Sequence, residues 1–76
     1  MLTLDRIGNK EKVKIVEILG GWFIRHKLTK LGIHPGDHVS VSKSGLFRGP
    51  LHIKVNGNEI ALGRRIASKI IVEVVK

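Results

Sequence analysis

The sequence has no cysteine and no tyrosine, and only one tryptophan and two phenylalanines stand among its 76 residues. Without cysteine, the chain can form no disulfide, zinc-thiolate centre or thiol nucleophile, so this small domain must rely on its apolar core for stability. The missing cysteine is compatible with a reducing cytoplasm, and Asp5 and Arg6 place charges in the N-terminal stretch where a secretory leader would be apolar. We therefore expect a cytoplasmic protein.

Acidic side chains and long apolar runs are also scarce. Six Asp and Glu residues stand against 14 Lys and Arg residues, which gives a net charge of +8. Such a balance favours an anionic partner, whether nucleic acid, an anionic membrane face or an acidic protein, without choosing among them. No apolar run approaches the roughly 20 residues of a membrane-spanning helix.

The chain also lacks a recognisable catalytic motif. Its six acids are scattered over predicted turns and strand faces, and no two of them form a carboxylate pair. The serines have no triad setting, and the loop from Gly45 to Gly49 lacks the Lys and the Ser or Thr of a phosphate-binding loop. We therefore expect a protein without enzymatic activity.

Short apolar alternations, typical of strands, run through the whole chain without internal repeats. They predict a single domain over residues 1–76 with strands at residues 12–19, 38–42, 51–55, 60–62 and 70–74. The first alternation changes phase between Ile15 and Val16, which predicts a bulge. Asn56 and Gly57 predict a tight hairpin turn.

One amphipathic helix is predicted at residues 22–31, between the first two strands. Its apolar stripe comprises Ile24, Leu28 and Leu31, and Gly32 suits a left-handed helix end. Together these elements predict a mainly β fold, a small five-stranded SH3-like antiparallel barrel, closed or nearly closed, with one short helix between the first two strands.

The predicted interior is small, so the largest side chains are expected inside it. Trp22 and Phe23 are therefore assigned to the core. In the last strand, three side chains are expected to face the core: Ile70, Val72 and Val74. Apolar residues on its outward side, Ile71 and Val75, would then form an edge that favours a homo-oligomer.

The helix and the turn after it resemble the signature of the FeoA family. The likeness lies in a glycine pair, a basic helix that ends in Leu-x-x-Leu-Gly, and a Pro-Gly turn: Gly20, Gly21, Arg25, His26, Lys27, Leu28, Lys30, Leu31, Gly32, Pro35 and Gly36. The second half is similar at Gly49, Pro50, Ile53, Val55, Gly57, Ile60, Ala61, Leu62, Ala67, Ile70 and Val72. One departure is Gly63, where the family commonly has Arg; this chain has Arg64 and Arg65 directly after it.

This resemblance implies an SH3-like fold and a role as a small accessory or regulatory protein of bacterial ferrous iron transport. The implied partner is the FeoB-type membrane GTPase transporter for Fe²⁺, which the chain would contact on the cytoplasmic side without inserting into the membrane itself. Similar modules stand at the C-terminal end of iron-dependent repressors, so the fold alone does not decide the role.

Two segments are predicted to contact the partner. The helix presents Arg25, Lys27 and Lys30, although charge on the outer side of an amphipathic helix is often only solvated. A glycine-flanked loop supplies the other candidates, Leu46, Phe47 and Arg48. The apolar residues of this loop either anchor a partner or a second copy of the chain, or they plug the end of the barrel.

Four histidines raise the question of a metal site. His34, His38 and His52 could converge near Asp37, the only acid close to them in the predicted arrangement. A Fe²⁺ or Zn²⁺ site usually needs three or more fixed ligands with carboxylate or thiolate support. Solvated histidines are therefore favoured over weak transition-metal binding, and no cofactor is assigned; Fe²⁺ is the metal that a site here would take.

The alternative interpretation is a nucleic-acid binding protein. Residues 36–39, with Gly45 and Gly49, resemble the KOW element of ribosomal and transcription proteins, and the net charge of +8 suits RNA phosphates. Against it, the three aromatic side chains are too few for a base-stacking surface or for a proline-peptide groove. The sequence therefore favours a protein-interaction module.

Overall fold

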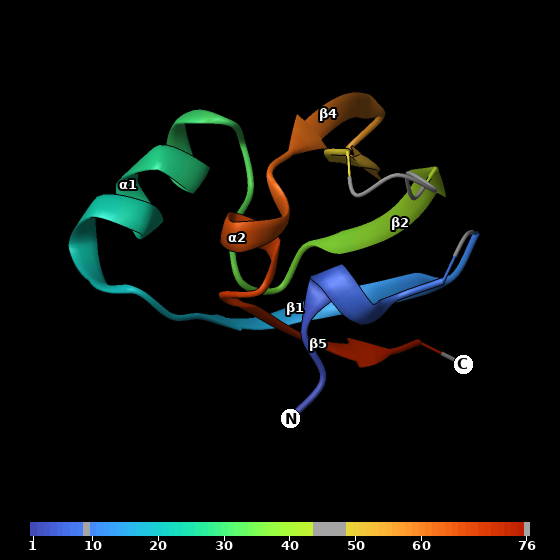
Figure 1. Cartoon of the computed structure of the whole chain (residues 1–76), viewed down its shortest axis with the longest axis horizontal. Helices are drawn as coiled ribbons and strands as arrows, with labels where there is room; N and C mark the ends of the chain where they lie inside the picture. The colour runs from blue at the N-terminus through green and yellow to red at the C-terminus, as the bar shows by residue number, and fades with distance from the viewer. Residues whose placement is uncertain (9, 44–48, 76) are drawn as a thin grey trace.

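The computed structural model describes residues 1–8, 10–43 and 49–75. This part of the chain forms five strands and three short helical segments (Figure 1). In chain order they are η1 (Leu4–Arg6), β1 (Lys12–Ile18), α1 (Gly21–Lys30), β2 (His38–Lys43), β3 (Leu51–Val55), β4 (Asn58–Leu62), α2 (Arg64–Ala67) and β5 (Ile70–Val74). Among the helices of these residues, none has the length and apolar character needed to cross a membrane.

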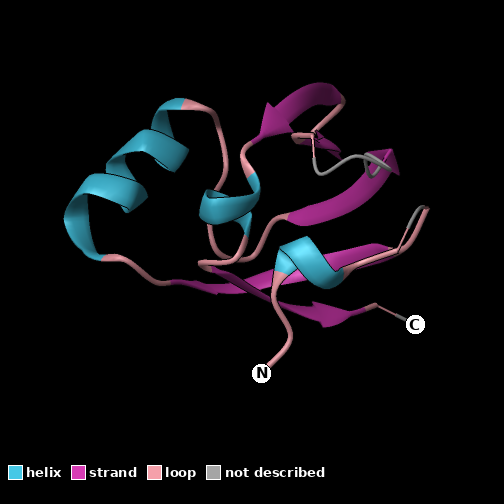
Figure 2. Cartoon of the chain, viewed as in Figure 1, coloured by secondary structure: helices cyan, strands magenta, loops and turns pink. Residues whose placement is uncertain are grey.

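The strands form one antiparallel sheet in the order β4-β3-β2-β1-β5. Strands that follow one another pair directly, except that β5 returns to lie beside β1. The sheet curls around the core, and α1 lies beyond one end of it (Figure 2). The predicted SH3-like fold is confirmed, but the barrel is open: within the described residues no ladder joins β4 to β5, which lie at opposite edges.

The core consists of aliphatic side chains from the inner face of the sheet. Strand β3 shows the pattern most clearly, because Leu51, Ile53 and Val55 are buried and the residues between them are exposed. Leu4 of η1 and Ala67 of α2 add to the same cluster. No polar or charged side chain among the described residues is buried, so the core is held by apolar packing alone.

The predicted bulge in β1 is confirmed. In the ladder with β5 the register shifts between Ile15 and Glu17, so that Val16 is the extra residue. Val16 is 48% exposed, whereas Ile18 is back in the core with 4% exposure. The change of phase in the sequence thus marks the place where the strand reverses its inner face.

The hairpin between β3 and β4 uses the predicted turn. Asn56 and Gly57 both have positive φ, 49° and 81°, and Val55 pairs with Asn58 across the turn. Two successive positive φ values are typical of the type I′ turn, whose twist matches that of the flanking strands.

The N-terminal segment covers part of the outer edge of β5. Thr3 forms a bridge with Ile71, and the Val72 N–H donates a hydrogen bond of 2.9 Å to the Leu2 carbonyl. Ile71 is consequently only partly exposed. The predicted outward apolar edge is therefore smaller than the alternation alone suggests.

The inward assignment of Val74 is wrong. Val74 is 49% exposed, although Ile70 and Val72 are buried as predicted. It is the last residue of an edge strand, and only Val13 of β1 stands opposite it in the sheet. An apolar side chain at such an end lacks the neighbours on further strands that bury the residues before it.

Candidate docking surface on helix α1

Helix α1 is bounded by glycines with positive φ. Gly20 (φ 98°) and Gly21 (φ 78°) turn the chain out of β1, and Gly32 (φ 82°) ends the helix as predicted. The turn at Gly32 is closed by the Ile33 N–H, which donates to the Leu28 carbonyl at 2.9 Å. These bounds fix which side of a short helix faces the sheet.

The inner face of α1 is narrow. Leu28 is fully buried and Ile24 packs partly against the core. Leu31, the third member of the predicted stripe, is 40% exposed because it caps the helix rather than continuing it. The apolar packing of α1 on the core therefore rests mainly on Leu28 and Ile24.

Trp22 and Phe23 lie on the outside, so their assignment to the core is wrong. They are 72% and 75% exposed, and the Trp22 ring stacks on the His26 ring with centroids 4.7 Å apart and an interplanar angle of 10°. The core of the described residues consists of aliphatic side chains, and neither ring belongs to it. Helical geometry contained the signal: Trp22 precedes the inward Ile24 by two residues, about 200° around the helix.

The cations of α1 divide between its two flanks. Phe23, His26, Lys27 and Lys30 line a shallow hollow of about 310 Å³ on the outer side. Arg25 lies on the other flank, where its Nε donates to the Ile18 carbonyl at 3.4 Å. The structure therefore brings Lys27 and Lys30 together beside Phe23 and sets Arg25 apart from them.

The flank of Arg25 borders a second hollow of about 250 Å³. Its walls come from α1, from the bulge in β1 and from the turn before β2: Val16, Glu17, Ile18, Arg25, Thr29 and Pro35. The exposed Val16 makes part of this hollow apolar. In this hollow, unlike the outer one, helix and sheet residues line one depression together.

The other predicted contact residues, Leu46, Phe47 and Arg48, lie outside the described residues. Their role as partner anchors stays a prediction.

The three histidines considered for a metal do not come together. His34 pairs with Asp37, whose carboxylate lies 3.4 Å from Nδ1 and also accepts the His34 N–H at 2.8 Å. His38 begins β2, whereas His52 is opposite Lys43 at the end of that strand, so five residues, roughly 16 Å, separate them. Within the described residues no three His, Cys, Asp or Glu side chains gather as metal ligands would.

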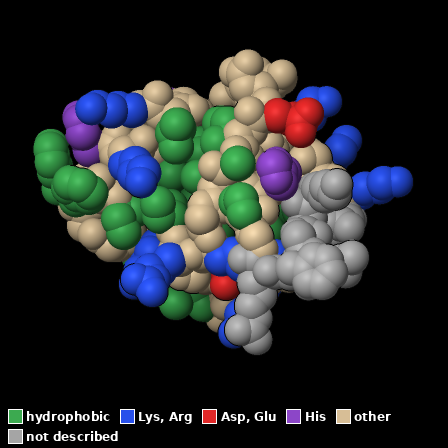
Figure 3. Space-filling model, turned by 45° about the horizontal axis from the view of Figure 1, so that its top comes forward, with side chains coloured by type: hydrophobic (Ala, Val, Ile, Leu, Met, Phe, Trp, Pro, Cys, Tyr) green, Lys and Arg blue, Asp and Glu red, His purple; other side chains and the backbone are tan. Residues whose placement is uncertain are grey.

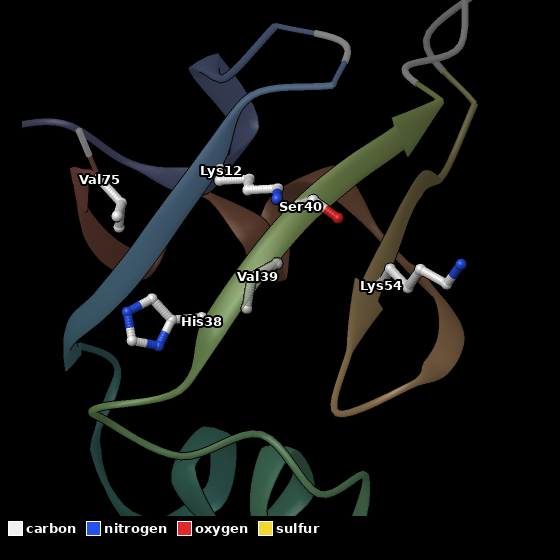
Figure 4. Close-up of a pocket in the computed structure, with 6 residues that line it drawn as sticks. All are labelled: Lys12, His38, Val39, Ser40, Lys54 and Val75. Atoms are coloured by element: carbon white, nitrogen blue, oxygen red, sulfur yellow. The ribbon is translucent and has the colours of Figure 1, made fainter.

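The outer face of the sheet carries a further cationic hollow that the sequence patterns did not reveal. It measures about 220 Å³ and is lined by Lys12, His38, Val39, Ser40, Lys54 and Val75 (Figure 4). Lys12 and Lys54 flank Ser40 across the ladders of β1, β2 and β3. Because Glu59 stands opposite Lys54 in β4, this row is less one-sided in charge than α1.

Of the two arginines that follow Gly63, Arg64 makes a contact within the fold. Arg64 Nε donates to the Gly49 carbonyl at 3.0 Å and so ties α2 to the segment before β3. Arg65 is exposed on α2. Arg64, which stands one position after the place where the family commonly has Arg, thus joins α2 to the segment before β3.

A model of the FeoA domain matches residues 2–74 of the chain. The chain belongs to the FeoA family. A crystal structure of an iron uptake regulatory protein, also of the FeoA family, is 34% identical, with 97% of this chain and 96% of that one covered and a TM-score of 0.89. No curated protein matches the sequence.

Other FeoA structures and some regulators share the fold. The iron(II) transport protein A from Clostridium thermocellum is 26% identical with a TM-score of 0.92; the match covers 97% of this chain and 46% of that protein. ScaR with bound Zn²⁺ is 24% identical with a TM-score of 0.90, over 99% of this chain and 37% of that one. The last likeness shows the fold alone. Membership of the FeoA family supports a role in ferrous iron transport systems.

Proposed function

We propose that this FeoA-family chain is a non-enzymatic accessory protein that docks to the cytoplasmic part of a FeoB-type GTPase transporter. The observation that carries this proposal is the family match over residues 2–74. The open surface of α1 supports it, because exposed aromatic rings beside cations are typical of docking sites rather than of solvated helices.

The proposed contact comprises Arg25, Lys27 and Lys30 of α1, with residues 46–48 as a second segment. The hollow lined by Arg25, Val16 and Pro35 is partly apolar and lies beside Arg25, while Lys27 and Lys30 lie on the other flank of α1. Charged groups at the rim of an interface mainly steer association, while the apolar seat slows dissociation. The transporter surface that fits here would be acidic around an apolar side chain.

The test measures binding of the chain to the purified GTPase region of the transporter, and beside it to mixed RNA, over a salt series. Charge reversal at all three positions, Arg25→Glu, Lys27→Glu and Lys30→Glu, should weaken binding to the GTPase region by at least about tenfold. The control reverses charge on the sheet at Lys12, Lys54 and Lys14, which gives the same net charge and should weaken binding much less. Equal losses in both variants, or tight RNA binding without GTPase binding, would contradict the proposal.

Two further expectations remain predictions. Weak binding of Fe²⁺ would involve His34 with Asp37, the one histidine-carboxylate pair in the described residues, and His34→Ala should abolish it in a metal titration. Self-association would show in sedimentation of the chain over a range of concentrations.

A further inference from the structure

The outer face of α1 combines two features that a solvated helix does not need. Trp22 and Phe23 are more than 70% exposed, although they are two of the three aromatic residues in the chain. Both rings are exposed to water, so their apolar area does not stabilise the fold, although a domain of this size has little apolar area to spare. The larger ring stacks on the His26 ring of the same helix and remains 72% exposed.

Positive charge surrounds these rings without any acid to balance it. Between Glu17 and Asp37 the sequence has no Asp or Glu, whereas Lys27 and Lys30 share a hollow with Phe23. Neither lysine forms an ion pair within the described chain. In Figure 3 the end of the molecule formed by α1 shows hydrophobic side chains beside histidine and basic side chains.

The shape of this face decides which anionic partner suits it. All four residues of the outer hollow come from one helix, so no second wall exists to grip a side chain from a partner protein. The face is the convex outer side of a helix whose inner side packs on the core through Ile24 and Leu28. A lipid bilayer adapts to a convex surface, takes aromatic rings at the depth of its headgroups and offers phosphates to nearby lysines.

We infer that the outer face of α1 binds the surface of an anionic lipid bilayer. Trp22 and Phe23 enter the headgroup region, and Lys27 and Lys30 contact lipid phosphates. The contact is peripheral and weak, since each lysine near an anionic surface strengthens binding only about fivefold. Anchoring of this strength adds to a second contact rather than replacing it.

This contact goes beyond the proposed docking to the transporter; the two share Lys27 and Lys30, whereas Arg25 belongs to the docking contact alone. Arg25 lies on the opposite flank of α1, in the hollow with Val16 and Pro35. A chain that rests on the inner leaflet through Trp22 and Phe23 therefore keeps that hollow free for a membrane-embedded partner. The bilayer contact needs no transporter, so the two proposals succeed or fail separately.

Trp22 is the single tryptophan of the chain, so its fluorescence reports on this face alone. The full chain is titrated with phosphatidylcholine vesicles and with vesicles in which part of that lipid is replaced by phosphatidylglycerol. We expect a blue shift with the anionic vesicles only, and quenching by lipids brominated in the upper part of the acyl chain. Unchanged emission with both kinds of vesicle would overturn the inference.

Matched variants separate this face from the general charge of the protein. Lys27→Glu with Lys30→Glu should weaken vesicle binding at least about 25-fold in a sedimentation assay, because it removes two lysine contacts and adds two repelled charges. Lys12→Glu with Lys54→Glu changes the net charge equally on the outer sheet face and should have a much smaller effect. Equal losses would mean that the charge of the whole chain, and not α1, attracts the membrane.

Removal of the aromatic rings tests the other half of the contact. Trp22→Ala with Phe23→Ala should reduce vesicle binding at least about tenfold, while circular dichroism shows an unchanged fold. If the soluble GTPase region shifts the Trp22 emission and anionic vesicles do not, the face docks a protein and the membrane inference is wrong.

Discussion

The inner face of the sheet and the outer face of α1 use apolar side chains in opposite ways. Every strand contributes aliphatic residues to one continuous core, and no aromatic ring of the described residues belongs to that core. Helix α1 contributes Leu28 and part of Ile24 to this core, yet it exposes the two largest apolar side chains of its sequence, Trp22 and Phe23. Buried aliphatic residues therefore stabilise the fold, whereas the exposed aromatic residues of α1 are available for binding. We expect substitutions in one group to affect stability and substitutions in the other to affect binding.

The largest expected effect on stability comes from a substitution in the core. Ile53 lies in β3 with no exposed surface, so Ile53→Ala should lower the free energy of unfolding by about 3 kcal/mol through lost contacts and a cavity. Ile53→Val, which removes one methylene group, should cost about 1 kcal/mol. Denaturant unfolding of both variants measures the difference, and equal small losses would show that the core tolerates the cavity.

The next effect concerns the link between the two regions. Gly20 has φ of 98°, and a Cβ built there would lie 2.5 Å from Ile24 Cδ1. Gly20→Ala should therefore destabilise the chain by about 2 kcal/mol, because backbone strain and a shift of Ile24 add together. Gly21→Ala serves as the control, since its φ is 78° but its Cβ would meet nothing within 4 Å. The same loss for both variants would mean that Ile24 simply moves aside.

A smaller effect is expected in the turn that connects α1 to β2. Asp37 accepts the His34 N–H at 2.8 Å, so Asp37→Ala should cost about 1 kcal/mol of stability. Asp37→Asn retains an acceptor oxygen and should restore most of that loss. Thermal unfolding at matched pH compares the three proteins, and no difference among them would show that the turn holds without this hydrogen bond.

The smallest effect on stability is expected for a substitution on the exposed face of α1. Trp22→Ala should change the free energy of unfolding by no more than about 0.5 kcal/mol, because the ring is 72% exposed. Urea denaturation followed by circular dichroism measures it without relying on tryptophan fluorescence. A decrease of several kcal/mol in the free energy of unfolding would mean that the ring is packed in the core, as the sequence predicted.

Much of the fold could be predicted because its signals are local. The phase change at Val16 and the Asn56-Gly57 pair each act through the backbone geometry of one or two residues, and the structure confirms both. The family likeness rested on the same kind of residue, glycines and prolines at turns. Neighbouring strands then follow the chain, so most of the sheet order needs little long-range information.

The candidate site was harder to predict because exposure depends on what covers a residue. Apolar character suggested burial for Trp22, Phe23 and Val74, and all three are exposed. For the two rings the helical period relative to Ile24 was the better guide, because the core of the described residues is aliphatic and includes neither ring. For the histidines, proximity in sequence and on a predicted face did not show that His38 and His52 stand at opposite ends of β2.

The open barrel leaves two strand edges that differ in their freedom to pair. The bridge from Thr3 and the hydrogen bond to the Leu2 carbonyl already occupy part of the β5 edge. Strand β4 pairs only with β3 among the described residues, so no other strand of that part of the chain occupies its outer edge. Any growth of the sheet by a strand from a second molecule should therefore add at β4, and the N-terminal residues act as a stop that gives such an assembly one direction.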